Sequence, residues 1–102
     1  MPKCPVKILP MAWQDLNAIA DYHLQTVGAA SAEKITDRIL DALEKLEEFP
    51  LMGTLHSDEF LARMEYRKVL CGEYVCVYKV IDTAVFVYRI VHEATDYPKQ
   101  FK

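Results

Sequence analysis

Apolar residues recur with a helical period through the first half of the chain. From Pro10 to Val27 and from about Ala30 to Phe49, they return every three or four positions, which is the spacing of one helix face. Gly28 separates the two segments and suits a helix stop, because glycine adopts positive φ without steric cost. Pro50 ends the second segment. The pattern predicts two helices that form an antiparallel hairpin.

Each predicted helix has one apolar face that needs a partner. In the first helix this face comprises Trp13, Leu16, Ala20, Leu24 and Val27, and in the second Ile35, Ile39, Ala42, Leu43, Leu46 and Phe49. Because two helices alone cannot bury both faces, we expect the hairpin to pack on a sheet.

The last third of the chain has the composition of β-strands. Residues 74–80 and 84–91 are dense in Val, Ile, Tyr and Phe, which suit a pleated surface, and a third short strand that starts at Tyr66 precedes them. Gly72-Glu73 and Asp82-Thr83 separate them as two-residue turns, and Gly72 suits a type II′ turn. These segments predict three consecutive antiparallel strands.

The remaining segments complete the predicted organisation. Val6–Leu9 follows Pro5 and predicts a short strand at a sheet edge, where proline is tolerated. Residues 51–64 show no clear period and predict a loop, and residues 93–102 predict a turn or short irregular tail. We therefore expect a single α+β domain over residues 1–102, with an N-terminal helical hairpin packed on a small twisted antiparallel sheet in the order β-α-α-β-β-β.

Counting outward from the two turns gives a strand register. It places Tyr78 opposite Arg67 and Val87, and Cys76 opposite Val69 and Arg89. Since side chains alternate between the faces of a sheet, one face carries Arg67, Tyr78 and Arg89. The other face carries Tyr66, Lys68, Val75, Val77, Phe86, Tyr88 and Ile90.

Composition and charge narrow the protein class. No run of 18 apolar residues and no signal-peptide pattern occur among the 102 residues, so we expect a cytoplasmic protein with no membrane partner. The three cysteines, Cys4, Cys71 and Cys76, lack metal or redox spacing and predict reduced thiols. Residues 1–60 hold five Lys/Arg against ten Asp/Glu, and residues 61–102 hold seven against five. A strongly basic footprint for RNA is therefore missing.

The histidines offer little support for a metal or cofactor site. His23, His56 and His92 have no metal-ligand spacing, so we expect no metal and no cofactor. We expect His23 on a helix surface and His56 in a loop. His92 follows the last strand and suits either a general acid or base, or a hydrogen bond to the backbone, of which we favour the second.

Arg67 and Arg89 flank Tyr78 on one predicted face. Two guanidinium groups could clamp a phosphate, or they could pair with acidic residues of the helices such as Glu44 or Asp41. We favour the structural ion pairs. Four tyrosines at strand spacing could stack on bases, but we favour core positions for Tyr66, Tyr74, Tyr78 and Tyr88.

Three segments make the chain resemble the RelE/ParE superfamily of bacterial type II toxin–antitoxin toxins. They are VKILPMAWQDLNAIADY, then ILDALEKLEEFPLMG, and finally YRKVLCGEYVCVYKV followed by VYRIVHEATDYP. Together they span nearly the whole chain in the family's order. The resemblance implies a helical hairpin on an antiparallel sheet, which is the fold expected from the residue pattern.

RelE-like members of the superfamily cut mRNA in the ribosomal A site, and their sheet carries several basic residues. The resemblance implies an Arg after Tyr74, where this chain has Val75, and a basic residue where it has Tyr66. Lys68 then stands alone. RelE also carries a basic run where this chain has residues 92–96, which are nearly neutral to acidic.

A nuclease mechanism would rest on three residues of this chain. Tyr97 is similar in position to the C-terminal Tyr of the nucleases, and some nuclease members use a His near His92. With Lys68, these would be the catalytic residues. A site that stabilises phosphorane-like charge needs several cations, so we keep this activity, with ribosome and mRNA as partners, as the alternative.

ParE-like members lack the nuclease residues and resemble this chain in the helices and in the RIVHEATDYP ending. They are taken to inhibit DNA gyrase, so the resemblance implies a gyrase inhibitor neutralised by a cognate antitoxin. We expect the target surface to comprise Arg67, Arg89, His92, Tyr97 and Lys99 as contacts. A second alternative is an inactive relative that only binds antitoxin. The choice between a homodimer and a hetero-oligomer with antitoxin stays open.

Overall fold

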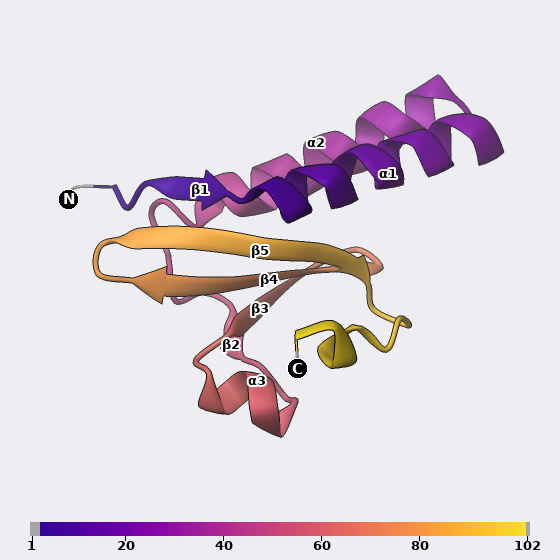
Figure 1. Cartoon of the computed structure of the whole chain (residues 1–102). Coiled ribbons are helices and arrows are strands. Elements are labelled where there is room, and N and C mark those ends of the chain that lie inside the picture. Colours follow the sequence, from indigo (N-terminus) through magenta and orange to yellow (C-terminus); the bar gives the residue numbers. More distant parts are fainter. Residues whose placement is uncertain (1–2, 102) are drawn as a thin grey trace.

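Helices and a sheet form successive layers in the computed structural model, which describes residues 3–101 (Figure 1). In chain order the elements are β1 (Val6–Ile8), α1 (Pro10–Thr26), α2 (Ala29–Lys45), β2 (Thr54–Leu55), α3 (Glu59–Arg63), β3 (Arg67–Cys71), β4 (Tyr74–Ile81), β5 (Ala84–His92) and the 3₁₀-helix η1 (Tyr97–Phe101). Within the described residues the strands form one five-stranded sheet in the order β1-β5-β4-β3-β2.

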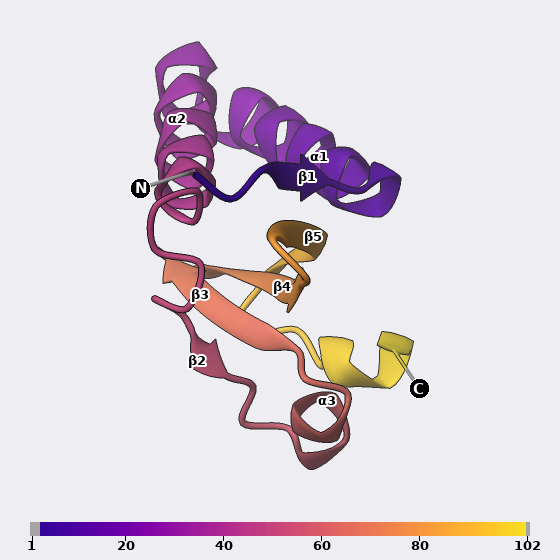
Figure 2. The ribbon, with the colours of Figure 1, turned by 90° about the vertical axis from the view of Figure 1, so that its left-hand side faces the viewer.

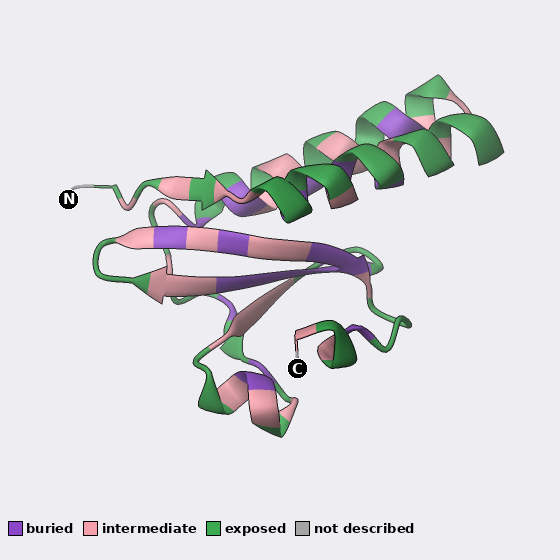
Figure 3. Ribbon diagram, viewed as in Figure 1, coloured by how far each residue is buried: buried purple, intermediate pink, exposed green. Residues whose placement is uncertain are grey.

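The two sheet faces are covered by different elements. α1 and α2 lie on one face, and α3 and η1 lie on the other side (Figures 1 and 2). The α1–α2 side holds the larger apolar cluster, to which the sheet contributes Cys71, Tyr74, Cys76, Tyr78, Val85, Val87 and Ile90. The opposite side holds a smaller cluster of Leu61, Val75, Val77, Val91 and Tyr97. The central strands are therefore the most buried part of the chain (Figure 3).

The helical hairpin has the predicted joint. Gly28 has a φ of 143°, a value that side chains with a Cβ rarely adopt, and its N–H donates to His23 O at 2.9 Å. α2 ends at Lys45 rather than Phe49, because the last residues before Pro50 form tighter turns, with Leu46 N–H donating to Leu43 O.

The buried face of α1 differs from the predicted one. It comprises Ala12, Leu16 and Ile19. Trp13, Leu24 and Val27, which were assigned to that face, are exposed. Two apolar stripes lie side by side on this helix, and the stripe that includes the small Ala12 packs closest to the sheet.

The α+β fold class is confirmed, with two additions. β1 pairs in parallel with β5, since Val6 lies opposite Val85, whereas the other strand pairs are antiparallel. The predicted loop over residues 51–64 contains β2 and α3. A helix of five residues is too short for its period to repeat, so the sequence pattern gave no signal for α3. Asp58 caps it by accepting from Leu61 N–H at 3.0 Å.

The strand register is correct up to a β-bulge in β5. Both turns have two residues, and Tyr78 lies opposite Arg67 and Val87 as predicted. Cys76 lies opposite Ile90 rather than Arg89. Val77 pairs with Arg89 and Tyr78 pairs with Val87, so Tyr88 is an extra residue of β5 that has no partner in β4. The bulge turns Ile90 toward the helices, so its predicted face was wrong.

Tyr78 ties the connection between α2 and β2 to the sheet. Its fully buried side chain donates to Pro50 O at 2.9 Å and accepts from Gly53 N–H at 3.0 Å. A Cβ on Gly53 would lie only 2.6 Å from the Tyr78 hydroxyl and 2.4 Å from Lys68 O. Glycine is therefore needed here for close approach of the backbone to the sheet.

The three cysteines are free thiols, as predicted. Cys71 and Cys76 are buried, and Cys71 lies opposite Tyr74 rather than Cys76. Burial raises the pKa of the Cys76 thiol to about 12, which keeps it protonated and unreactive.

Candidate functional site

Tyr97 anchors the C-terminal segment to the underside of the sheet. It begins η1, is buried in the smaller apolar cluster, and its hydroxyl lies 2.7 Å from His56 Nε2. His56 follows β2 and is only 5 % exposed, so the prediction that it lies in a loop missed its role as a buried partner. The His56–Tyr97 pair joins two segments that are 41 residues apart.

The hydrogen bonds of His56 define its neutral tautomer. Asp58 N–H donates to Nδ1 at 2.9 Å, so the proton of the neutral ring lies on Nε2, which donates to the Tyr97 hydroxyl. Burial, followed by the nearby positive charge of Lys68, lowers the pKa of His56, and Asp58 opposes this shift. Burial also raises the pKa of Tyr97. Both the His56 ring and the Tyr97 hydroxyl are therefore held in their neutral forms.

A cleft of about 530 Å³ opens beside this pair. Lys68 lines it and contacts Ser57 Oγ at 3.1 Å. Among the described residues, Lys68 is its only Lys or Arg, whereas three carboxylates line it: Asp58, Glu93 and Asp96. An RNA phosphate would meet net negative charge here, and phosphoryl-transfer chemistry needs the opposite.

His92 lies in a different cavity from Lys68 and Tyr97. It ends β5 and lines a space of about 610 Å³ together with His23 and Tyr74. Its Nδ1 accepts from Ala94 N–H at 3.1 Å, which is the backbone bond favoured from the sequence, and its Nε2 lies 3.5 Å from Glu73. The structure therefore brings two of the three candidate catalytic residues together and places the third elsewhere.

Arg89 forms a structural ion pair, the arrangement that the sequence favoured. Its partner is Asp15 of α1 rather than Glu44 or Asp41, with Nε 2.7 Å and Nη2 3.1 Å from the carboxylate. The same carboxylate accepts from Ile90 N–H at 2.9 Å. Both side chains are mostly buried.

Arg67 bonds to backbone carbonyls rather than to an acidic side chain. Its Nη2 donates to Gly53 O at 2.6 Å and to Leu51 O at 3.3 Å. The predicted ion pair of Arg67 with an acidic residue of the helices was therefore wrong. The guanidinium group bonds instead to carbonyl groups of the segment that follows α2. Arg67 and Arg89 thus have separate partners in the fold.

The predicted target-contact residues divide by exposure. The side chain of Lys99 is 79 % exposed, pairs with Asp96 at 3.1 Å, and stands free of the core. His92 is also partly exposed. Arg67, Arg89 and Tyr97 make the intramolecular contacts described above.

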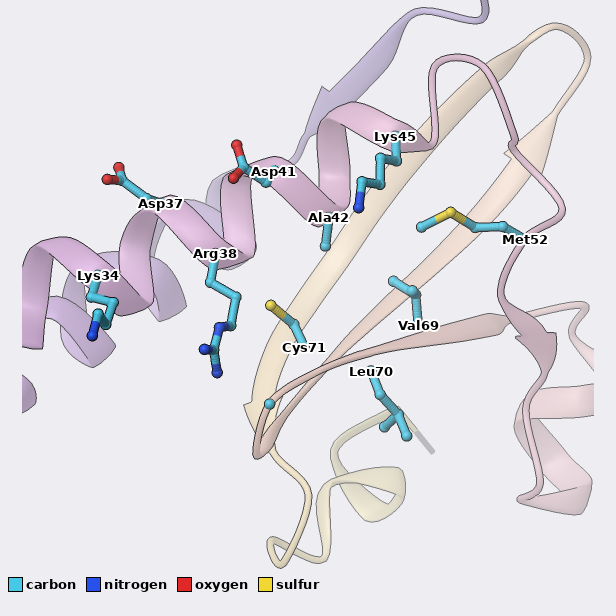
Figure 4. Close-up of a pocket in the computed structure, with 11 residues that line it drawn as sticks. Lys34, Asp37, Arg38, Asp41, Ala42, Lys45, Met52, Val69, Leu70 and Cys71 are labelled. Carbon is cyan, nitrogen blue, oxygen red and sulfur yellow. The ribbon is translucent and has the colours of Figure 1, made fainter.

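A groove between α2 and β3 was not anticipated from the sequence (Figure 4). It encloses about 610 Å³. Apolar residues form its floor: Ala42, Met52, Val69 and Cys71. Lys34, Arg38 and Lys45 extend from α2 toward the side of β3, whereas Asp37 and Asp41 point away from it (Figure 4). The helical period of α2 could predict that the three cations extend from one side of the helix. The sequence does not show that β3 lies beside this side of α2 and forms the groove with it.

Metal and membrane sites have no support in the described part of the chain. No group of three or more His, Cys, Asp or Glu residues within residues 3–101 is arranged to hold a metal ion. None of the helices described there combines the length and the apolar content needed to span a bilayer.

Comparison with known proteins identifies a family. The sequence profile described as "ParE toxin of type II toxin-antitoxin system, parDE" matches residues 6–97. No curated protein sequence matches the chain.

Two solved structures share the fold. A chain of the chromosomal ParDE toxin–antitoxin system from P. aeruginosa aligns with a TM-score of 0.75 and 20% identity, covering 88% of this chain and 96% of that one. A chain of the RelBE2 toxin–antitoxin complex from Mycobacterium tuberculosis aligns with a TM-score of 0.66 and 22% identity, covering 90% and 99%.

Proposed function

Because the chain belongs to the ParE toxin family of type II toxin–antitoxin systems, we propose that it inhibits DNA gyrase in the cytoplasm through protein–protein contact and is neutralised by a cognate antitoxin. The observation that carries this proposal is the match of the ParE profile over residues 6–97. The antitoxin is supported further by the two structural neighbours, which come from toxin–antitoxin systems.

The charge distribution favours a protein contact over RNA cleavage. The cleft beside Tyr97 has one lysine and three carboxylates, and the whole chain has a net charge of −3. Protein targets tolerate this balance, whereas an mRNA held at its phosphates requires clustered cations.

The proposed target surface is the exposed part of the C-terminal segment. His92 and Lys99 make the contacts, and Arg89 and Tyr97 hold the segment in place through the bond of Arg89 to Gln100 and the bond of Tyr97 to His56. Arg67 acts at a distance from this segment, through its bond to Gly53 O. Replacing His92 and Lys99 together with alanine should raise the concentration needed for inhibition about tenfold. Arg63→Ala removes an equally exposed cation from α3 and serves as the matched control.

The direct test uses purified protein in two parallel assays. One follows DNA supercoiling by gyrase, and the other maps mRNA ends by primer extension on translating ribosomes. Loss of supercoiling with intact mRNA is the expected result. No effect in either assay would instead indicate an inactive relative that only binds antitoxin.

The nuclease alternative has one observation in its favour. His56 and Tyr97 form a hydrogen-bonded acid–base pair beside Lys68. Codon-phased cuts in the mRNA would support this alternative against gyrase inhibition. Loss of those cuts in His56→Gln would then distinguish this pair from His92, which lines the other cavity.

A further inference from the structure

A cavity lies where the last turn of α1 meets the turn between β3 and β4. It encloses about 610 Å³. Tyr22 and His23 line it from α1, and Glu73, Tyr74 and His92 line it from the sheet. The end of α1 and the end of β5 lie on the same side of the molecule (Figure 1). Because His92 belongs to the proposed target surface, the cavity continues that surface onto the helical hairpin.

The lining of this cavity favours positive charge. Among the described residues that line it, Glu73 is the one carboxylate, and none is Lys or Arg. The Glu73 side chain is 78 % exposed and lies 3.5 Å from His92 Nε2, which is longer than a charge-assisted hydrogen bond. The last turn of α1 adds the negative end of a helix dipole. Arg38 lies beside Gly72 but lines the groove between α2 and β3 rather than this cavity.

The walls of the cavity are aromatic and apolar. Tyr22 is exposed at the rim, whereas Tyr74 is buried beneath it. The Tyr74 hydroxyl lies 3.1 Å from His23 Nε2, and His23 Nδ1 lies 3.0 Å from Ser31 Oγ, so these contacts fix the Tyr74 ring in place. A ring that is already fixed loses little conformational freedom when a ligand binds. The apolar part of the lining comprises Ala18, Ile19 and Val27.

An arginine side chain matches this combination of groups. Its planar guanidinium group stacks on aromatic rings, forms two parallel bonds to one carboxylate, and is more weakly hydrated than an ammonium group. Its methylene stem can pack on the apolar wall. A phosphate group, in contrast, would meet the Glu73 carboxylate and the negative end of α1.

We propose that this cavity binds an arginine side chain of the target protein. The guanidinium group bonds to Glu73 and lies against the rings of Tyr22 and Tyr74, and the stem lies on the apolar wall. This inference rests on the proposed function, because it assigns one contact of the inhibited protein to a place on the chain.

Titration with two amino-acid amides tests the cavity in the absence of the target. N-acetyl-arginine amide carries a guanidinium group, and N-acetyl-citrulline amide carries a neutral ureido group of nearly the same shape. The arginine amide should shift the NMR resonances of the Tyr22, Glu73 and Tyr74 backbone amides at concentrations about tenfold lower. Glu73→Gln should remove this preference. Equal binding of the two amides, or shifts confined to other parts of the chain, would overturn the proposal.

Inhibition of gyrase tests the carboxylate. Glu73→Gln keeps the shape of the side chain, removes its charge, and should raise the concentration needed to inhibit supercoiling about tenfold. The matched control is Glu59→Gln, which changes the net charge equally at an exposed position on α3, outside the cavity. If the two variants inhibit equally, the cavity does not bind an arginine of the target.

Tyr22 tests the aromatic wall. Tyr22→Ala should weaken inhibition about threefold or more, because the guanidinium group loses one ring. Tyr22→Phe keeps the ring and should inhibit like the wild type. An equal loss in both variants would show that the guanidinium group does not lie on this ring.

The two assays together separate this inference from the proposed function. If Glu73→Gln inhibits gyrase like the wild type, the cavity proposal fails and the inhibitor function stands. If the wild-type chain does not inhibit gyrase, the proposed function fails, and the amide titration alone decides whether the cavity binds arginine. If Glu73→Gln weakens only antitoxin binding or only self-association of the chain, the arginine belongs to that partner, and its assignment to the target is wrong.

Discussion

Asp15 performs a task that its place in the sequence does not reveal. From the middle of α1 it accepts two bonds from Arg89 and one from the backbone N–H of Ile90. β1 ends before this part of β5, so the carboxylate occupies the position where a strand partner would otherwise bond. The bulge at Tyr88 presents Arg89 and Ile90 N–H to the same group.

Removing the Asp15 carboxylate should therefore be costly. In Asp15→Ala, a mostly buried Arg89 loses its counter-charge and Ile90 N–H loses its acceptor, which we expect to lower the free energy of unfolding by about 3–5 kcal/mol. Asp15→Asn keeps an oxygen for Ile90 and should cost less. Urea denaturation of both variants measures the difference. Equal stability of Asp15→Ala and wild type would refute the structural role of this pair.

His56 should make stability depend on pH. Its pKa is lowered in the folded chain from the ordinary value of 6.5, so the unfolded chain binds a proton that the folded chain resists. The full stability is present above about pH 6.5, and it is lost as the pH falls from there through the folded-state pKa. Thermal unfolding between pH 7.5 and pH 5 measures this loss.

His56→Gln provides the control for this pH dependence. Glutamine cannot titrate but keeps a donor for the Tyr97 hydroxyl. The variant should therefore show a shallower fall in stability over the same range. An identical pH profile would show that other groups, rather than His56, cause the dependence.

At the scale of elements, the connection between α2 and β2 depends on one hydroxyl. Tyr78→Phe keeps the shape of the ring but leaves Pro50 O and Gly53 N–H without their partner. We expect a loss of about 1–3 kcal/mol in the free energy of unfolding. Tyr22→Phe removes an exposed hydroxyl and should cost almost nothing. Equal effects of the two substitutions would contradict the role given to Tyr78.

Local rules predicted the hairpins and missed what distant residues decide. Gly72 and Asp82 both adopt positive φ, at 62° and 55°, which suits two-residue turns. Because both turns have two residues, counting outward from them gives the correct partners of Tyr78. The bulge has no such marker, because Tyr88 and Arg89 fit a regular strand equally well. His56 lies next to turn-forming residues, and only the fold brings Tyr97 to it.

The candidate site was predictable in part for the same reason. The predicted last strand covered residues 84–91, and β5 extends one residue further, to His92. The predicted hydrogen bond of His92 to the backbone is confirmed, with Ala94 N–H as the donor. Whether Arg67 and Arg89 are available to a target depends on Gly53 and Asp15, which are 14 and 74 residues away in the chain. The groove beside β3 also depends on how little of β3 is paired with β2. β2 has only two residues, Thr54 and Leu55, and so short a segment shows no strand pattern in the sequence.

For the whole molecule, η1 acts as a cover for the lower face of the sheet. A chain that ends at residue 96 lacks Tyr97 and Phe101, which pack on Val77 and Val91. We expect a loss of about 3–5 kcal/mol in the free energy of unfolding, because an aromatic ring leaves a core. Greater binding of a hydrophobic dye should accompany this loss. A truncated chain with wild-type stability would show that η1 is dispensable for the fold.

The pairing of β1 with β5 also governs when this protein can fold during its synthesis. Val6 is synthesised before both helices, whereas its partner Val85 is synthesised after them and after β2, β3 and β4. β5 lies between β1 and β4, so the sheet cannot assemble until that strand has emerged. The nascent chain therefore carries an exposed helical hairpin until β5 has been synthesised, and the complete sheet forms only after that.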